Sequence, residues 1–265
     1  MAKYFRYAGT IVLLGAIVAP AICFADSIED VEKQIRDAYG KLKSYSANVN
    51  SQTDIKQGGQ AISMTMTGSF LAKNGENGKH MYRMEGKTSM KMPGMDHPGM
   101  GDQELLVVCD GEYTYQVQTN PMTSQKNVIK TDADADPLPW AQQKENHTFK
   151  VLPDEKVDGQ DCFVVEATPK TPGGMGVART VFYIRKDIGA LVKQVAYNTE
   201  GEALNTTTFN DVKVNPDVSA DQFKFEVPEG VTVMDRTTSD KEEAGEKKAD
   251  EKEEKSPEKK DDGDK

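Results

Sequence analysis

The stretch Ile62-Ser63-Met64-Thr65-Met66-Thr67-Gly68-Ser69-Phe70 alternates apolar and polar side chains. Ile62, Met64, Met66 and Phe70 share one parity, and serines and threonines dominate the other. Successive side chains of a β-strand point to opposite faces of a sheet, so a period of two is typical of a half-buried strand. The stretch therefore predicts a strand with one apolar and one polar face.

Turn signals that contain glycine separate the later apolar runs. Asp110-Gly111 lies between Leu105–Val108 and a run that carries Tyr113, Tyr115 and Val117, which is the pattern of a β-hairpin. Three later turn signals predict further hairpins, and a last apolar run before Pro228 is expected to close the sheet. The turns are Asp158-Gly159, Asp187-Ile188-Gly189 and Glu200-Gly201, and the last run contains Phe223, Phe225 and Val227.

An amphipathic helix is predicted to start at Ser27. Ser27 and Asp30 have the spacing of a capping box, with Asp in place of the usual Glu. An apolar stripe then recurs at helical intervals, and charged side chains occupy the other face. The stripe is Ile28, Val31, Ile35, Tyr39 and Leu42, and the charged face is Glu29, Glu32, Lys33, Arg36 and Lys43. Such a helix must lie on an apolar surface.

The segment Asp136–Asn146 has no strand pattern and contains the single tryptophan, Trp140, behind Pro137 and Pro139. We expect a short helix there. One amphipathic helix, many strands joined by hairpins and this inserted segment indicate an α+β fold with a large curved antiparallel sheet.

The two ends of the chain do not have the composition of a folded domain. Residues 1–25 combine basic residues, a short apolar run and a small-residue cleavage pattern, which predicts a secretory signal peptide. Acylation of Cys23 is the alternative. Residues 237–265 are predicted to be a disordered charged tail, because 20 of the 26 residues from Asp240 to Lys265 are charged. Residues 26–236 remain as one exported, periplasmic domain.

Composition and motifs argue against several classes of function. The net charge of -10 excludes a generic basic nucleic-acid binder. The three histidines form no two-histidine metal motif, and the chain has no nucleophile elbow and no phosphate loop. The alternating Asp132, Asp134 and Asp136 lack the later Gly and Glu of a calcium loop. We therefore expect no enzyme activity, no metal site and no cofactor.

Methionine and cysteine leave alternatives open. Eight of the 12 methionines lie between Met64 and Met100. Thioethers and imidazole suit Cu(I), so Met95, His97 and Met100 favour a copper-binding loop in one interpretation. An apolar cavity with adaptable thioethers is the other, and it also accounts for methionines on a strand face. Cys109 and Cys162 are compatible with a disulfide or with two buried free thiols.

The C-terminal part of the domain resembles the C-terminal part of the LolA-type periplasmic lipoprotein carriers. The likeness rests on Phe209–Asn215 and Asp221–Val231, and it extends to Asp110-Gly111 before two tyrosines, Val157-Asp158-Gly159 and Ile184–Asp187. It covers most of residues 26–235. The resemblance implies an incomplete, half-open β-barrel closed by helices, whose cavity holds the acyl chains of lipoproteins during transport across the periplasm.

On this resemblance the chain is expected to be a non-enzymatic carrier of an acylated lipoprotein or lipid, served by inner- and outer-membrane transport partners. One set of residues is expected to line the apolar cavity and another to form the lid. The cavity set is Ile62, Met64, Met66 and Phe70, with Tyr113, Tyr115 and Val117 as second choices, and the lid set is Ile28, Val31, Ile35, Leu42 and Trp140.

The sequence also departs from the family. The carriers use an arginine in an early strand to latch the lid, and no arginine occurs here between Arg36 and Arg83, so that latch is absent or replaced. A periplasmic copper-binding module and an envelope sensor that binds a protein partner remain the alternative functions.

Overall fold

The computed structural model describes residues 27–57, 60–75, 79–91, 103–119, 125–134, 136–171 and 176–238. The predicted signal peptide, the segment with Met95, His97 and Met100, and the tail from residue 239 lie outside these ranges. The described elements are α1 (Ile28–Tyr39), β1 (Ser44–Gln57), β2 (Gln60–Asn74), β3 (His80–Lys91), β4 (Gln103–Cys109), β5 (Tyr113–Thr119), β6 (Lys126–Asp132), η3 (Ala141–Gln143), β7 (His147–Val157), β8 (Gln160–Pro169), β9 (Arg179–Arg185), β10 (Ala190–Tyr197), β11 (Ala203–Val214), η5 (Ala220–Phe223) and β12 (Thr232–Asp235).

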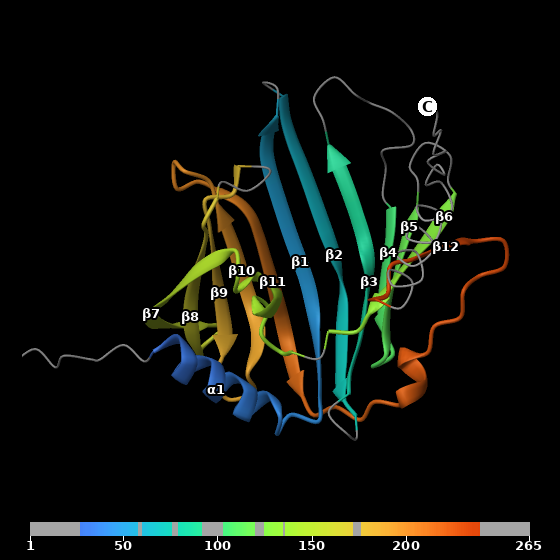
Figure 1. Cartoon of the computed structure of the whole chain (residues 1–265), viewed down its shortest axis with the longest axis horizontal. Coiled ribbons are helices and arrows are strands. Elements are labelled where there is room, and N and C mark those ends of the chain that lie inside the picture. The colour runs from blue at the N-terminus through green and yellow to red at the C-terminus, as the bar shows by residue number, and fades with distance from the viewer. Residues whose placement is uncertain are drawn as a thin grey trace, which may run out of the picture.

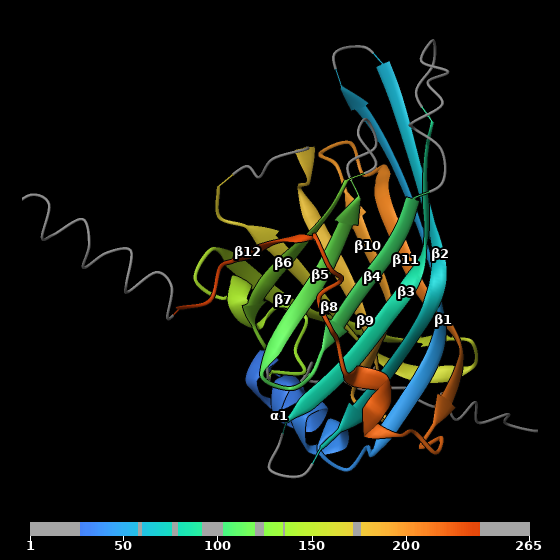
Figure 2. The same cartoon turned by 90° about the vertical axis from the view of Figure 1, so that its right-hand side faces the viewer.

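The described strands form a single sheet with the order β12-β6-β5-β4-β3-β2-β1-β11-β10-β9-β8-β7. Neighbouring strands are antiparallel except for the short β12, which pairs with β6 in parallel. The sheet is strongly curved, with α1 at one end of its concave side and η5 outside its convex side (Figures 1 and 2). The predicted α+β class with a large curved antiparallel sheet is confirmed.

The four predicted hairpins are present, and local backbone chemistry explains why they were recognisable. Gly111, Gly159, Gly189 and Gly201 all have positive φ, between 63° and 91°. Glycine adopts this conformation without the steric penalty that a Cβ atom would bring. Each turn therefore lies where the sequence placed it.

A pair of glycines allows β2 and β3 to approach closely. Gly68 and Gly86 are direct partners in the β2–β3 register. A Cβ atom on Gly68 would lie 2.3 Å from the main-chain oxygen of Glu85, and one on Gly86 would lie 2.3 Å from that of Thr67. Because both contacts are to backbone atoms, no side chain can move aside to make room.

Helix α1 packs its apolar stripe on the sheet as predicted. Ser27 caps the helix, and its side chain accepts a hydrogen bond from the amide of Asp30. Val31 and Ile35 are fully buried in one cluster with Trp140, whose partners from β8 and β9 include Phe163 and Phe182. The helix thus covers the β8–β9 part of the sheet.

Three details of the sequence prediction are wrong. The helix ends at Tyr39, so Leu42 lies beyond it and packs with Tyr45 and Ala72 in a separate cluster. Glu32, placed on the charged face, is buried. The run with Phe223, Phe225 and Val227 forms no strand, since Phe223 ends η5 and the sheet closes with β12 instead.

Cys109 and Cys162 are both buried and free. They lie in β4 and β8, which six other strands of the sheet separate. This arrangement selects the free-thiol alternative. Among the described residues, no helix has both the length and the hydropathy to cross a membrane.

Candidate functional site

Strand register assigns each side chain to one face of the curved sheet. Phe70 is paired with Ala47 in β1 and with Met84 in β3, and Met84 is paired with Val107 in β4. From β1 toward β9, the same face continues through Val49 and across β11 and β10 to Phe182 of β9. Phe182 packs in one cluster with Val31 and Ile35 of α1. We call this the concave face.

The register places the seven predicted cavity residues on two different faces. Ile62, Met64, Met66 and Phe70 share one parity in β2 and lie together on the concave face. Tyr113, Tyr115 and Val117 have the opposite parity, because Val107 on the concave face is paired with Gln116. These three second-choice residues therefore lie on the convex face, away from the first group.

An aromatic cluster occupies the middle of the concave face. The ring of Phe70 lies 5.2 Å from that of Tyr45, 5.6 Å from that of Phe209 and 6.1 Å from that of Tyr82. Phe70 and Phe209 are only half-buried in the described structure. Their rings supply apolar surface that is open to a ligand.

A hollow of about 500 Å³ lies between this cluster and the segment Asp136–Asn146 with Trp140, which we call the predicted lid segment. One wall is aromatic, and the other is formed by Asp134, Asp136–Pro139 and Ala141–Gln143. The aromatic wall is uncharged at neutral pH, because burial raises the pKa of Tyr39 to about 12 and lowers the pKa of His80. The ring of His80 lies 5.1 Å from that of Tyr39, and Tyr45 and Tyr82 complete the wall.

At the end of the sheet away from α1, the concave face carries both methionines and hydroxyl-bearing side chains. Met64 and Met66 line a hollow of about 230 Å³ together with Met90 of β3. Ser51 and Thr53 border it, and both accept hydrogen bonds from the side-chain amide of Asn205, at 3.0 and 2.8 Å. Ile62 lines a further hollow beyond this one, with Ile55 and Leu204.

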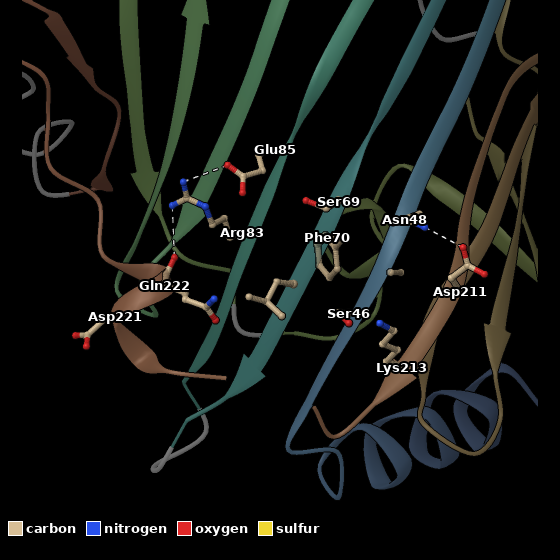
Figure 3. A pocket seen from close by; sticks show the side chains of 12 residues that line it. Ser46, Asn48, Ser69, Phe70, Arg83, Glu85, Asp211, Lys213, Asp221 and Gln222 are labelled. Carbon is tan, nitrogen blue, oxygen red and sulfur yellow. Dashed lines mark hydrogen bonds and ion pairs between the residues drawn. The ribbon is translucent and has the colours of Figure 1, made fainter. Parts of the chain in front are cut away.

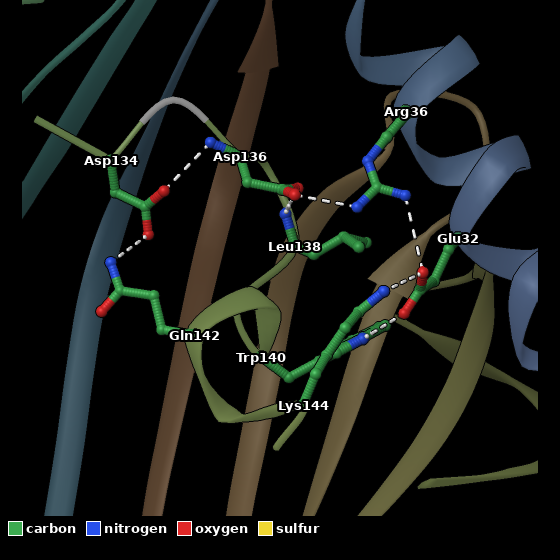
Figure 4. A network of polar contacts seen from close by, with 8 residues as sticks. All are labelled: Glu32, Arg36, Asp134, Asp136, Leu138, Trp140, Gln142 and Lys144. Carbon is green, nitrogen blue, oxygen red and sulfur yellow. Dashed lines mark hydrogen bonds and ion pairs between the residues drawn. The ribbon is translucent and has the colours of Figure 1, made fainter.

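The predicted lid segment is fastened to α1 by a small polar network (Figure 4). The indole nitrogen of Trp140 donates to Glu32 at 2.9 Å, and the ammonium group of Lys144 donates to the same carboxylate at 2.5 Å. Arg36 bridges Glu32 at 3.5 Å and Asp136 at 2.8 Å. Helix and segment are therefore joined at both ends of the segment.

The network also sets the ionisation of its acids. Burial alone would raise the pKa of Glu32, but hydrogen bonds from Lys144 and Trp140 and the positive charges nearby lower it overall. Burial opposes ionisation of Asp136 as well, and its hydrogen bond with Arg36 is the main influence that lowers its pKa. Both carboxylates are charged at neutral pH, which maintains the ion pairs.

The convex face is partly covered by the chain after β11. The ring of Phe225 stacks on Tyr115 at 4.9 Å, and η5 contacts β3 through a hydrogen bond of Arg83 to the main-chain oxygen of Gln222. The chain then reaches β12 at the edge of the sheet (Figure 2). Covered in this way, Tyr115 is not available to a ligand on the concave face.

A wider hollow of about 680 Å³ lies beside η5, but its chemistry is polar. Figure 3 shows Arg83, Glu85, Asp211, Lys213 and Asp221 around it. Charged walls oppose the transfer of an acyl chain from water. The uncharged aromatic and methionine surfaces lie instead on the concave face.

Sequence reasoning missed several concave-face residues. Leu105 and Val107 of β4, Val49 of β1 and Phe209 of β11 all lie on it by register. Leu105 and Val107 share a parity that is visible in the sequence, and so do Tyr45, Ala47 and Val49 of β1, which alternate with polar residues. Met95, His97 and Met100 of the copper interpretation lie outside the described residues. Within the described ranges, no group of three or more His, Cys, Asp or Glu side chains is placed to hold a metal ion.

Comparison with known proteins gives one related sequence and several similar folds. An outer-membrane lipoprotein carrier protein of Pseudoalteromonas translucida (strain TAC 125) is 25% identical over 245 residues, which is 87% of this chain and 97% of that protein. A family model described as "-like: Uncharacterized protein" matches residues 116–242.

Two solved structures are similar to most of the chain. An uncharacterized conserved protein from Thermus thermophilus is 11% identical with a TM-score of 0.49, over 80% of this chain and 100% of that one. A chain of the MucA/MucB complex of Pseudomonas aeruginosa is 16% identical with a TM-score of 0.46, over 74% of this chain and 60% of that one. The relationship to the lipoprotein carrier spans most of both chains and confirms the resemblance to LolA-type carriers found in the sequence.

Proposed function

We propose that this protein is an exported, non-enzymatic carrier that shields acyl chains of lipoproteins or lipids on its concave face during passage across the periplasm. The observation that carries the proposal is the half-buried aromatic and aliphatic surface around Phe70, which the described chain leaves open. Burial of acyl carbons contributes about 0.8 kcal/mol per methylene. Transport proteins of the inner and outer membrane are the expected donors and acceptors of the cargo.

The acyl chain is expected to lie along Phe70, Phe209 and Val107 and to enter the hollow beside Tyr39. The guest is expected to lie against the uncharged aromatic wall of that hollow, since the carboxylates of Asp134 and Asp136 are on the opposite wall. Met66 and Met64 extend the contact surface toward the opposite end, and Ile62 lies beyond them. Methionine side chains adapt to guests of different shape.

The lid in this proposal is α1 together with the segment around Trp140. Val31 and Ile35 hold the helix on the sheet, with Ile28 packed at the margin of the same cluster. Leu42 anchors the turn after the helix. In this arrangement, Glu32 and Arg36 of α1 take the place of the family's early-strand arginine.

Two adjacent leucines of β4 provide a matched test. Leu105 lies on the concave face and Leu106 on the convex face, and both are half-buried. Leu105→Asn should weaken binding of a fluorescent long-chain fatty acid about tenfold, because about 1.4 kcal/mol of apolar contact is lost. Leu106→Asn should leave the affinity close to that of the unchanged protein, since its side chain does not face the guest.

Native mass spectrometry of the protein purified from a cell envelope identifies the molecule that co-purifies with it. We expect a bound lipid or acylated protein, and the Leu105→Asn variant should retain less of it than the Leu106→Asn variant. Equal fatty-acid affinity in the two folded variants would contradict a concave binding surface.

A further inference from the structure

Three methionines meet at the end of the concave face that lies away from α1. Met64 and Met90 are direct partners in the β2–β3 register, and Met66 follows Met64 by two residues on the same face. All three line the hollow of about 230 Å³. We propose that Met64, Met66 and Met90 form a binding site for Cu(I), in addition to the surface that Met64 and Met66 offer to an acyl chain.

The strand geometry brings the three sulfur atoms within reach of one ion. Directly paired residues on neighbouring antiparallel strands have Cβ atoms about 4.5–5.5 Å apart, and diagonal neighbours lie about 7–8 Å apart. Methionine has three rotatable side-chain bonds, so its sulfur can move by several ångströms without a change in the backbone. A three-coordinate thioether site therefore needs side-chain rotation only.

The ligand chemistry selects the metal. Thioethers are soft ligands and favour Cu(I) over hard divalent cations, which prefer carboxylate and water oxygens. Among the described residues that line the hollow, none is Asp, Glu, His or Cys. The remaining lining side chains are Ser51, Thr53, Thr65, Thr88, Ser89 and Gln103. A neutral set of soft donors suits a monovalent soft cation.

The cluster is bordered by hydroxyl groups and is reachable from solvent. Ser51 and Thr53, the register partners of Met66 and Met64, are held by hydrogen bonds from Asn205. Met90 is 39% exposed, so an ion can reach the cluster from solvent.

The test uses the mature protein and Cu(I) added without oxygen, in competition with a chromophoric Cu(I) chelator. The variant M64L/M66L/M90L removes the three sulfur atoms and keeps apolar side chains of similar volume, which a folded chain tolerates well. The matched control is M81L/M84L, which changes two methionines of β3 that do not line the hollow. Both proteins keep the methionines and the histidine of residues 92–100.

We expect the triple variant to bind Cu(I) at least about tenfold more weakly, because loss of even an outer-shell partner of a metal ligand typically costs about that much affinity. The control should bind as the unchanged protein does. Equal affinity of the triple variant and the control would overturn the proposal.

A second measurement does not depend on any variant. In protein labelled with ¹³C at the methionine methyl groups, Ag(I) serves as a stable substitute for Cu(I). The resonances of Met64, Met66 and Met90 should shift together as Ag(I) is added. Shifts confined to other methionines would refute the site even if the triple variant failed to fold. Fatty-acid binding of the Leu105→Asn and Leu106→Asn variants reports separately on the carrier function.

Discussion

The indole nitrogen of Trp140 donates a 2.9 Å hydrogen bond to a carboxylate oxygen of Glu32, 108 residues earlier in the chain. Both residues are buried, and Lys144 donates to the other oxygen of the same carboxylate. One acidic side chain of α1 thus satisfies two donors of the segment that packs against it, so helix and segment depend on the same carboxylate.

Replacement of Glu32 should loosen the segment around Trp140. Glu32→Ala leaves a buried indole N–H without its acceptor and should lower the free energy of unfolding by about 1–3 kcal/mol. Glu32→Gln keeps an acceptor for Trp140 and should cost less. Urea denaturation measures both, with Lys33→Ala on the exposed side of α1 as the control. Equal stability of the Ala variant and the control would contradict the network.

Acid should weaken the same contacts. The pKa of Glu32 is lowered from its ordinary value of 4.5 in the folded state, so its contribution is complete above about that pH and is lost as the pH falls through the folded value. The pKa of Asp136 is lowered too, and its contribution disappears in the same direction. Stability measured from pH 7 downward should therefore fall less steeply in Glu32→Gln below about pH 4.5 than in the unchanged protein. Parallel curves would count against an ionised Glu32 in the folded state.

The close approach of β2 and β3 should not tolerate a side chain at Gly68. Gly68→Ala places a methyl group against the main-chain oxygen of Glu85 and should destabilise the fold by about 1–3 kcal/mol. Ser69→Ala, the next residue on the opposite face, serves as the control. Thermal unfolding compares the two, and an unchanged midpoint for Gly68→Ala would show that the strands can separate without cost.

The two cysteines should behave as buried thiols. Burial raises the pKa of Cys109 and of Cys162, which leaves little thiolate at pH 7. Iodoacetamide should therefore modify neither residue in the folded protein and both after denaturation without a reducing agent. Intact-mass measurement detects each addition. Failure to label after denaturation would indicate a disulfide.

The hairpins could be predicted because their chemistry is local. Gly111 and Gly189 supply a positive φ at a turn, and the flanking apolar runs are short. Strand β1 was not predicted, because its alternation of Tyr45, Ala47 and Val49 with polar residues is short and stops at Ser51. Its concave positions include Ser51 and Thr53, whose hydroxyl groups are satisfied by Asn205 of β11, and no sequence period records a partner 152 or 154 residues away.

The face of a side chain is the part of the site that a single strand cannot reveal. Parity within β2 correctly grouped Ile62, Met64, Met66 and Phe70, because the four belong to one strand. Parity within β5 grouped Tyr113, Tyr115 and Val117 equally well, but the relation between the two groups depends on the registers of β3 and β4. The burial of Glu32 likewise depends on Trp140, which local periodicity does not include.

The position of β12 at the edge of the sheet also affects whether copies of the protein associate through their sheet edges. A long open sheet exposes backbone donors and acceptors at its edges, and these recruit further strands into fibres. On one edge, β6 is covered by four residues of β12, secured by the Lys130–Asp235 ion pair at 3.0 Å and by the bond from the amide of Arg236 to the oxygen of Lys130 at 2.9 Å. On the other edge, β7 carries Pro153 and a register irregularity between Leu152 and Glu155. Both edges are poor templates for further strands, so the protein is expected to stay dispersed at high concentration.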